Sequence, residues 1–448
     1  MSRAALVPNS KSDADHIYYT ASVINNTTST SGLENDPIAR FVETRDTPIL
    51  KDANDYECCV MKVVINGAGK NLPILIPQIQ PGASPTKTIY SVTLNAVVYD
   101  VAGGDVNDLI YVSSGEVFLE WIPENFDLSV LKPASALPTQ VDTSYYYLYS
   151  YNHWVVIINN ALKTAYDQLV ANIQATPGNG GYVMANRQPT VEFDENTNLF
   201  SFYTDTTNTS WGNTQGPPVY ANLGPAGTNV FPTALNTAEF MFVGFNLNFE
   251  GLMCNFDTQY YGKDEVPWAM GFDDLTGVQK QLYEPENTLL VRNKSGTNVQ
   301  NVISPTTGLP YVPALLNFVT TQDFESTSTL WSPVGGIVLT TQLLPLRNEF
   351  VSSPVAFGSS SGTQGSAAFQ TVLLDFNPVF QSTDEYRGLL TFQPDSEFIP
   401  VAMTQSHQEV KSIDFTVCWR NRLTNQLVPM RLYNCGSLSV RLLFRRRE

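Results

Sequence analysis

The sequence predicts a mainly β protein, a jelly-roll β-sandwich with an inserted, loop-rich domain containing one long helix. Many short segments alternate apolar and polar residues, which is typical of antiparallel sheets with one buried face. Only 15% of the 448 residues are charged, and 28 Gly and 28 Pro are present, a composition that does not suit a helical bundle. The 24 Phe, 21 Tyr and 6 Trp supply enough core material to exclude a disordered chain.

The first 45 residues form a polar leader. The run from Asn25 to Gly32 consists of Asn, Thr, Ser and Gly, which bury too little apolar surface to order themselves. Residues 1–45 are therefore predicted to be a flexible N-terminal arm, either disordered or ordered on a partner. No apolar run resembles the core of a signal peptide near Met1, so secretion by such a signal is not expected.

Strands begin after this leader. Cys59, Met61, Val63 and Ile65 alternate with more polar residues, and Asn66-Gly67 follows as a turn signal. Two more segments alternate in the same way, from Tyr90 to Val98 and from Val117 to Trp121. Residues 46–150 are therefore predicted to supply the first part of the jelly roll.

One helix is predicted, from Tyr151 to about Gln174. Its apolar residues recur at spacings of three and four, and Pro177-Gly178 ends the pattern. The following stretch, residues 176–235, is rich in Gly and Pro, and a strand is predicted from Met241 to Phe249. We expect residues 151–329 to form an insertion domain.

The last third of the chain returns to alternating strands, at residues 337–343, 413–419 and 438–444. Half-buried alternation of this kind belongs to antiparallel sheets. Residues 330–448 are therefore expected to complete a discontinuous jelly-roll domain with residues 46–150.

The charge is unevenly distributed. Eight basic and two acidic residues give the segment from Lys411 to Glu448 a net charge of +6, which leaves −23 for the residues before it. The candidate partner-binding residues here are Arg441, Arg445, Arg446 and Arg447. Arg441, Arg445 and Arg447 share one face of an extended strand. Two interpretations stay open: contact with phosphate or an acidic neighbour, including another copy of the chain, or a charged strand end that prevents edge pairing.

No catalytic, cofactor-binding or metal site is predicted. The G-x-S-x-G pattern at Gly358 to Gly362 lies in a Gly/Ser-rich loop, whereas a nucleophile elbow needs a strand before it and a helix after it. The three His are isolated and the five Cys form no C-x-x-C pair, which favours reduced thiols in an intracellular compartment. No 18-residue apolar run predicts a membrane span. Nucleic-acid binding is not expected as the primary function, because the chain is strongly acidic.

A P-P-x-Y tetrapeptide occurs in the loop-rich stretch. Pro217, Pro218 and Tyr220 make it a candidate partner-binding site. Proline-rich segments of this type dock in the aromatic grooves of WW domains. A WW-domain protein is therefore a possible partner.

The C-terminal strands resemble those of a known family. The segments Phe415 to Leu423, Leu427 to Leu432 and Val440 to Arg446 resemble the closing strands of the penton, or minor capsid, proteins of virophages and polinton-like viruses. Residues 46–74 are similar to the opening strands of these proteins. The resemblance covers residues 40–150 and 330–448 and consists of strands and turns rather than a catalytic signature.

The resemblance implies a structural virion protein and not an enzyme. In that family a jelly roll, often with an inserted domain, forms homopentamers at the vertices of an icosahedral capsid, surrounded by major capsid protein of the same virion. The expected location is the virion, after synthesis in the host cytoplasm or nucleus, and the WW-domain partner is then a host protein.

Two alternatives remain open. The chain is long enough for a major capsid protein with two jelly rolls. From another class, a β-rich carbohydrate-binding protein or glycosidase would use aromatic residues, such as Trp211, for sugar stacking and carboxylates for acid–base chemistry.

Overall fold

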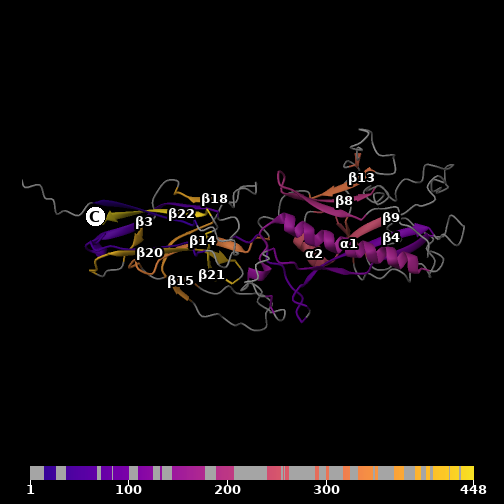
Figure 1. The fold of residues 1–448 in the computed structure, drawn as a ribbon, viewed down its shortest axis with the longest axis horizontal. Coiled ribbons are helices and arrows are strands. Elements are labelled where there is room, and N and C mark those ends of the chain that lie inside the picture. Colours follow the sequence, from indigo (N-terminus) through magenta and orange to yellow (C-terminus); the bar gives the residue numbers. More distant parts are fainter. Residues whose placement is uncertain are drawn as a thin grey trace, which may run out of the picture. The chain divides into compact units, whose positions relative to one another are not determined.

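The computed structural model divides into two compact units (Figure 1). Unit 1 contains Met1–Pro73, Asn125–Val130 and Pro333–Glu448, and unit 2 contains Ile74–Glu124 and Leu131–Ser332. The residues that the structure describes are 15–26, 37–67, 72–82, 84–99, 109–124, 132–133, 144–176, 188–205, 240–253, 256, 258–261, 288–291, 299–301, 316–322, 331–346, 349–351, 368–377, 389–394, 400–403, 407–422, 424–432 and 435–447.

Unit 1 is built from two antiparallel sheets. Its principal strands are β1 (His16–Ile24), β2 (Arg40–Thr44), β3 (Tyr56–Asn66), β14 (Val334–Thr340), β17 (Val372–Phe376), β18 (Leu389–Phe392), β20 (Ser412–Asn421) and β22 (Ser437–Arg446). One sheet has the order β1-β22-β3-β18, and the other has the order β17-β14-β20-β2.

This order is that of a jelly roll. When the eight strands are lettered B to I along the chain, the sheets read BIDG and CHEF, which is the arrangement of two interlocked Greek keys. The jelly roll predicted from the sequence is therefore confirmed. The chain of unit 2 is inserted between β3 and β14, the third and fourth of these strands.

Short strands extend these sheets. β19 (Val401–Ala402) pairs with β3, and β21 (Leu427–Pro429) pairs with β20. A separate pair of strands, β15 (Glu349–Val351) and β16 (Ala368–Gln370), lies between β14 and β17 in the sequence.

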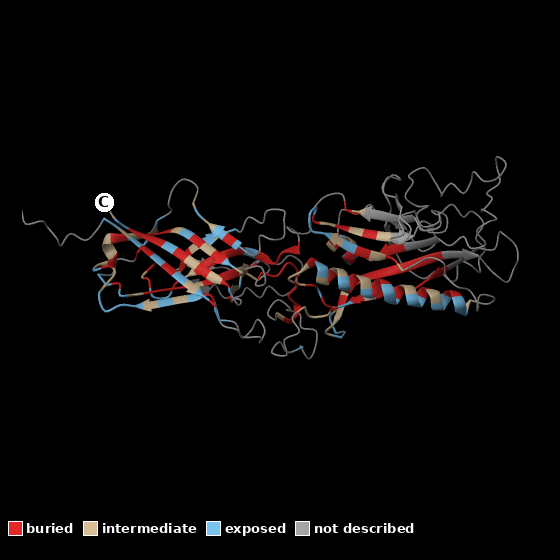
Figure 2. Cartoon of the chain, turned by 45° about the horizontal axis from the view of Figure 1, so that its top comes forward, coloured by how far each residue is buried: buried red, intermediate tan, exposed pale blue. Residues whose placement is uncertain are grey.

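The core of unit 1 is formed by the alternate residues that the sequence pattern picks out. Inward-facing side chains that are at most 1% exposed are Ile413, Phe415, Val417 and Trp419 of β20, and Leu438, Val440, Leu442 and Phe444 of β22. Figure 2 shows these strands as alternating buried and more exposed segments. The ring of Phe41 in β2 stacks on that of Phe415, with centroids 5.0 Å apart, so β2 also contributes to the core.

The N-terminal segment differs from the flexible arm expected over residues 1–45. β1 pairs with β22 along its whole length, and β2 pairs with β20. Tyr19 and Ala21 of β1 are buried, while Tyr18 and Thr20 face outward. The polar run beyond β1 concealed this alternation, and the segment is part of the jelly roll.

Asn25 anchors the end of β1. Its side chain is 2% exposed and donates a hydrogen bond of 2.7 Å to the carbonyl of Leu432. Its backbone N–H donates to the carbonyl of Gly436 at 2.9 Å. The first residue of the polar run is therefore a buried connector, because its amide satisfies backbone groups that would otherwise be unpaired.

Unit 2 contains two further sheets. Its strands are β4 (Lys87–Tyr99), β5 (Leu109–Ser113), β6 (Val117–Glu120), β7 (Thr190–Asp194), β8 (Leu199–Asp205), β9 (Phe240–Phe245), β10 (Thr258–Tyr261), β11 (Thr288–Val291), β12 (Val299–Asn301) and β13 (Leu316–Thr321). One sheet has the order β10-β11-β9-β4-β5, with β6 also paired to β4, and the other has the order β12-β13-β8-β7.

The helix α1 (Tyr151–Ala175) confirms the predicted helix. Its buried residues recur at spacings of three and four and pack against β4, β6 and β7. The carboxylate of Glu124 accepts hydrogen bonds from the backbone N–H groups of Tyr149 at 2.6 Å and Ser150 at 3.1 Å, just before the helix begins. His153 bonds through Nε2 to the carbonyl of Ile122 at 2.7 Å, so it ties the helix to the end of β6.

The strand expected from Met241 to Phe249 ends earlier, at Phe245. The helix α2 (Leu247–Met253) follows it. Asn246 causes the change, because its Oδ1 accepts a hydrogen bond of 2.9 Å from the N–H of Phe249 and so caps the helix. Alternating apolar residues alone could not distinguish this short helix from a longer strand.

The two units also differ from the expected domain boundaries. Residues 74–124 and 131–150 were expected in the jelly roll, but they belong to unit 2. The reason lies in β4, which pairs with β5, β6 and β9 and with no strand of unit 1 among the described residues. Regular alternation predicts a strand but not the sheet that it joins.

Candidate functional site

The candidate arginines lie at the C-terminal end of β22. Alternate residues of this strand point into the core, which leaves Arg441 and Arg445 exposed on the outer face of the BIDG sheet. Arg446 is the last residue of the strand, and Arg447 follows it. Arg441 and Arg445 therefore share a face as predicted, whereas Arg447 lies beyond the strand.

Arg445 and Arg446 contact acidic residues at the start of β3. Arg445 Nη2 lies 3.0 Å from Glu57 Oε2, and Arg446 Nη2 lies 3.9 Å from Asp55 Oδ2. The backbone N–H of Arg446 also donates to the carbonyl of Asp15 at 2.9 Å. These groups are 25–49% exposed, so each ion pair adds little stability on its own. Together they fix the end of β22 against its neighbours.

Arg447 is also bound within unit 1. Its Nη2 donates to the carbonyl of Met403 at 2.8 Å, and its backbone N–H donates to the carbonyl of Asp55 at 2.8 Å. In addition, β22 lies between β1 and β3. The interpretation of the arginines as protection of a sheet edge is therefore wrong, because β22 is paired on both sides.

Arg441 has a different environment. Its guanidinium lies over the ring of Tyr18, 5.2 Å from the centroid, a cation–π contact. In the sheet register it stands between Thr20 of β1 and Lys62 of β3. Lys62 is exposed like Arg441, so two cationic side chains lie directly opposite each other on the outer face.

A histidine–carboxylate pair lies near the start of β3. His407 Nδ1 lies 2.6 Å from Asp52 Oδ2, and the N–H of Asn54 donates to Asp52 Oδ1 at 2.9 Å. The hydrogen bond with Asp52 raises the pKa of His407. The hydrogen bonds from His407 and Asn54 lower the pKa of Asp52.

This pair is expected to stabilise the fold in a defined pH window. A raised His pKa contributes stability that is fully present below the unfolded pKa of about 6.5 and is lost as pH rises through the folded value. A lowered Asp pKa contributes stability that is present above the unfolded pKa of about 3.9 and is lost on acidification. An NMR titration should give His407 a midpoint above that of a free imidazole, and Asp52→Asn should lower this midpoint toward the ordinary value. An unchanged midpoint in the variant would contradict the pairing.

The described part of the chain contains no group of three or more His, Cys, Asp or Glu that could hold a metal ion. No helix within it is long and apolar enough to cross a membrane. Cys58, Cys59 and Cys418 are buried free thiols. Burial raises the pKa of all three, that of Cys418 to about 11, so these thiols are poor nucleophiles.

Two features predicted from the sequence lie outside the described residues. They are the tetrapeptide with Pro217, Pro218 and Tyr220, and the aromatic residue Trp211. The WW-domain interaction therefore stays a prediction.

Comparison with known proteins identifies the family. The model of the Sputnik minor capsid protein V18/19 family matches residues 17–446, which is almost the whole chain. The chain belongs to this minor capsid family. The resemblance to virophage minor capsid proteins is thus confirmed, and the protein is a structural component of a virion.

Individual relatives of this minor capsid protein are consistent with the family assignment. The protein V18 of Sputnik virophage is 28% identical over 138 residues, which are 29% of this chain and 71% of V18. A chain of the cryo-EM structure of the Sputnik virophage matches with a TM-score of 0.64 and 19% identity, covering 97% of this chain and 98% of its own. The mavirus penton protein matches with a TM-score of 0.51 and 14% identity, covering 97% and 100%. These two likenesses show a shared fold.

The charge pattern of this minor capsid protein predicts its arginines but not the residues that surround them. Arg445 and Glu57 are 388 residues apart in the chain, and no local pattern relates them. The same holds for Tyr18 and Lys62, because only the pairing of β1 and β3 with β22 brings them near Arg441.

Proposed function

We propose that this minor capsid protein is the penton subunit, and that five copies close each vertex of an icosahedral capsid in contact with the major capsid protein of the same virion. The observation that carries the proposal is the BIDG/CHEF jelly roll at the two ends of the chain. The likeness to the mavirus penton protein over nearly the whole chain supports it. The role is structural and needs no catalysis.

The two units have separate roles in this proposal. Unit 1 forms the shell, and unit 2 is a domain inserted into the jelly roll. The alternative of a major capsid protein with two jelly rolls is disfavoured, because the described strands of unit 2 form sheets of the order β10-β11-β9-β4-β5 and β12-β13-β8-β7 around α1. Neither order is that of BIDG or CHEF.

Apolar side chains on the surface of unit 1 support assembly. Among the described residues, its exposed large hydrophobic side chains are Tyr18, Ile24, Ile38, Val42, Leu343 and Leu389. Tyr18, Ile24 and Val42 lie on β1 and β2, the edge strands of the two sheets within the described part. An edge strand also offers unpaired backbone groups to another chain, and we assign the contact along β2 to a neighbouring copy.

The pair Arg441 and Lys62 supports an acidic partner. Like charges directly opposite each other in a sheet are destabilising. An acidic surface against them would remove this repulsion, and the chain itself carries a net charge of −17. A neighbouring copy is therefore a suitable partner for this part of the surface.

A lysine at position 42 is expected to break the ring. Val42 is 52% exposed, so Val42→Lys should leave the core intact while it places a charge in the contact between copies. Sedimentation of the full-length wild-type chain should give a species of about five times 49.5 kDa at high concentration. The variant should sediment as a monomer with an unchanged melting temperature.

Val156→Lys is the matched control. Val156 is 49% exposed and lies on α1 of unit 2, so this variant should assemble like the wild type. A wild-type chain that stays monomeric at all concentrations and does not enter capsid shells would contradict the penton assignment. A pentameric Val42→Lys protein would contradict only the placement of the contact on β2.

A further inference from the structure

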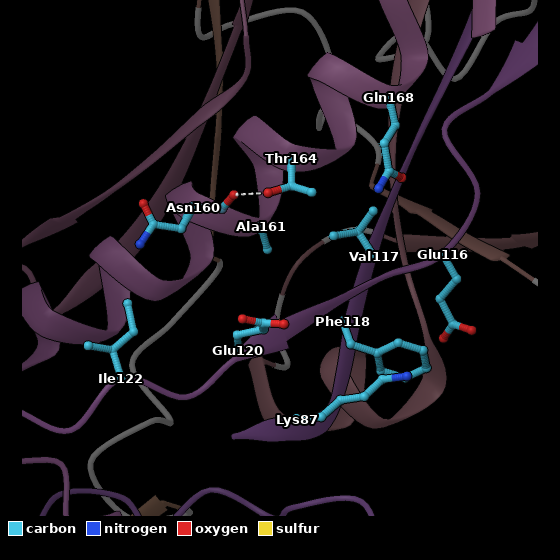
Figure 3. A pocket seen from close by; sticks show the side chains of 10 residues that line it. All are labelled: Lys87, Glu116, Val117, Phe118, Glu120, Ile122, Asn160, Ala161, Thr164 and Gln168. Carbon is cyan, nitrogen blue, oxygen red and sulfur yellow. Dashed lines mark hydrogen bonds between the residues drawn. The ribbon is translucent and has the colours of Figure 1, made fainter. Parts of the chain in front are cut away.

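Unit 2 contains a half-open groove between α1 and β6 (Figure 3). Its cavity volume is about 460 Å³, within the range of sites for small ligands. The helix forms one wall of the groove, and β6 with the start of β4 forms the other. No function assigned above uses this groove.

The helical wall presents neutral polar side chains. Asn160, Thr164 and Gln168 follow one another at intervals of four residues, which places them in a row on one side of α1. Asn160 and Gln168 carry amides, which both donate and accept hydrogen bonds. Ala161 lies between them as a small buried residue, so this wall leaves room for a ligand.

The strand wall presents charges of both signs. Glu120 and Lys87 stand opposite each other in the register of β6 and β4. In Figure 3 the carboxylate of Glu120 lies between the strand and Ala161. The ammonium group of Lys87 lies over the ring of Phe118, 4.2 Å from the centroid.

Other parts of the strand wall are already engaged or apolar. Glu116 accepts a hydrogen bond of 2.6 Å from the hydroxyl of Ser91. Val117 and Ile122 add an apolar surface to the same groove. Glu120, Asn160 and Gln168 are therefore the main polar groups that can turn to a ligand.

The charged, neutral polar and apolar side chains of the groove together favour a neutral ligand with hydroxyl groups. An anion would meet the carboxylates of Glu116 and Glu120, and a cation would meet the ammonium group of Lys87. Hydroxyl groups match both donors and acceptors, because each hydroxyl donates one hydrogen bond and accepts others. The apolar Val117 and Ile122 suit the C–H faces of a sugar ring.

We propose that the groove between α1 and β6 binds a neutral saccharide, with Glu120, Asn160 and Gln168 as its main hydrogen-bonding residues. The ligand is a hexose or a hexose unit of a glycan. This assignment is independent of ring formation by unit 1, since all the residues that line the groove lie in unit 2.

The test uses the full-length protein and neutral sugars. Glucose, galactose, N-acetylglucosamine and lactose are titrated in saturation-transfer NMR and calorimetry, and at least one should bind with a dissociation constant of about 1 mM. Glu120→Gln should weaken binding about tenfold, because it replaces a charge-assisted hydrogen bond by a neutral one. Thr164→Trp should abolish binding by filling the groove.

Asp167→Asn is the matched control. Asp167 lies on α1 outside the groove and pairs with the exposed Lys163, so this variant should bind like the wild type. The absence of binding by all four sugars at about 50 mM would overturn the proposal. Binding that survives both Glu120→Gln and Thr164→Trp would place the sugar elsewhere and also overturn it. If instead a tetra-arginine peptide binds and the sugars do not, the groove is a site for a cationic partner.

Discussion

Deletion of residues 1–45 is expected to leave the jelly roll unfolded, so that little soluble protein with a cooperative melting transition is recovered. The deleted segment contains β1 and β2. β1 pairs with β22 from His16 to Ile24, and β2 pairs with β20 from Arg40 to Thr44. Loss of these strands exposes the backbone edges of β22 and β20 and uncovers the inward-facing core.

The loss of folding stability can be estimated from the hydrogen bonds and buried side chains that the deletion removes. Each backbone hydrogen bond contributes about 1 kcal/mol. Full burial of a large apolar side chain contributes about 1.5–3 kcal/mol; Tyr19 is buried and Phe41 is half-buried. Summed over two strands, the loss exceeds the total stability of about 5–15 kcal/mol that is typical of a domain. The soluble yield, circular dichroism and limited proteolysis would measure it.

Deletion of residues 1–14 is the control. This shorter deletion ends before β1 begins at His16, so the melting temperature should stay close to that of the full chain. A folded protein without residues 1–45 that still fails to enter capsid shells would instead support a flexible arm that becomes ordered on a partner. That result would contradict the structural role that we assign to β1 and β2.

The elements that the sequence predicts correctly are those with a strong local pattern. The helix α1 is visible because its buried residues repeat over 25 positions. The strands β20 and β22 are visible because each contains four alternating core residues. β1 also alternates, but it lies next to the run of Asn, Thr and Ser that follows Ile24, and the composition of the whole segment concealed it.

The local pattern of a strand does not determine which sheet the strand joins. β4 alternates as regularly as β3, yet β4 belongs to unit 2 and β3 to unit 1. The candidate site has the same difficulty. The arginines of β22 could be found by their charge, whereas Glu57 and Lys62 take part only because antiparallel pairing brings β3 beside β22.

Asp414→Ala is expected to destabilise unit 1 by about 3 kcal/mol, since it removes the acceptor of several hydrogen bonds at a buried position. The alternation of β20 predicts an outward-facing side chain at this position, but the structure leaves Asp414 only 1% exposed. The segment from Thr341 to Leu343, which follows β14, explains this burial. The hydroxyl of Thr341 and the backbone N–H groups of Gln342 and Leu343 all donate to the same oxygen of the Asp414 carboxylate.

The contacts of Asp414 define its role. Its Oδ1 accepts hydrogen bonds from the hydroxyl of Thr341 at 2.8 Å and from the N–H groups of Gln342 at 2.9 Å and Leu343 at 2.8 Å. Its Oδ2 lies 3.9 Å from Arg40 Nη2, so the same side chain joins β20, β2 and the segment after β14. Asp414→Asn keeps an acceptor oxygen and should therefore lose less stability than Asp414→Ala.

Scanning calorimetry should show this effect in the transition of unit 1. A loss of 3 kcal/mol corresponds to a fall of about 6–12 °C in melting temperature for a unit of this size. Asp375→Ala is the matched control, because Asp375 of β17 pairs with Arg420 at 2.7 Å but is 37% exposed, and an exposed ion pair contributes only about 0–1 kcal/mol. Equal effects of the two variants would show that Asp414 acts as an ordinary surface ion pair. A much larger effect of Asp414→Ala, partly rescued by Asp414→Asn, would identify this buried carboxylate as the group that holds the segment after β14 on the CHEF sheet.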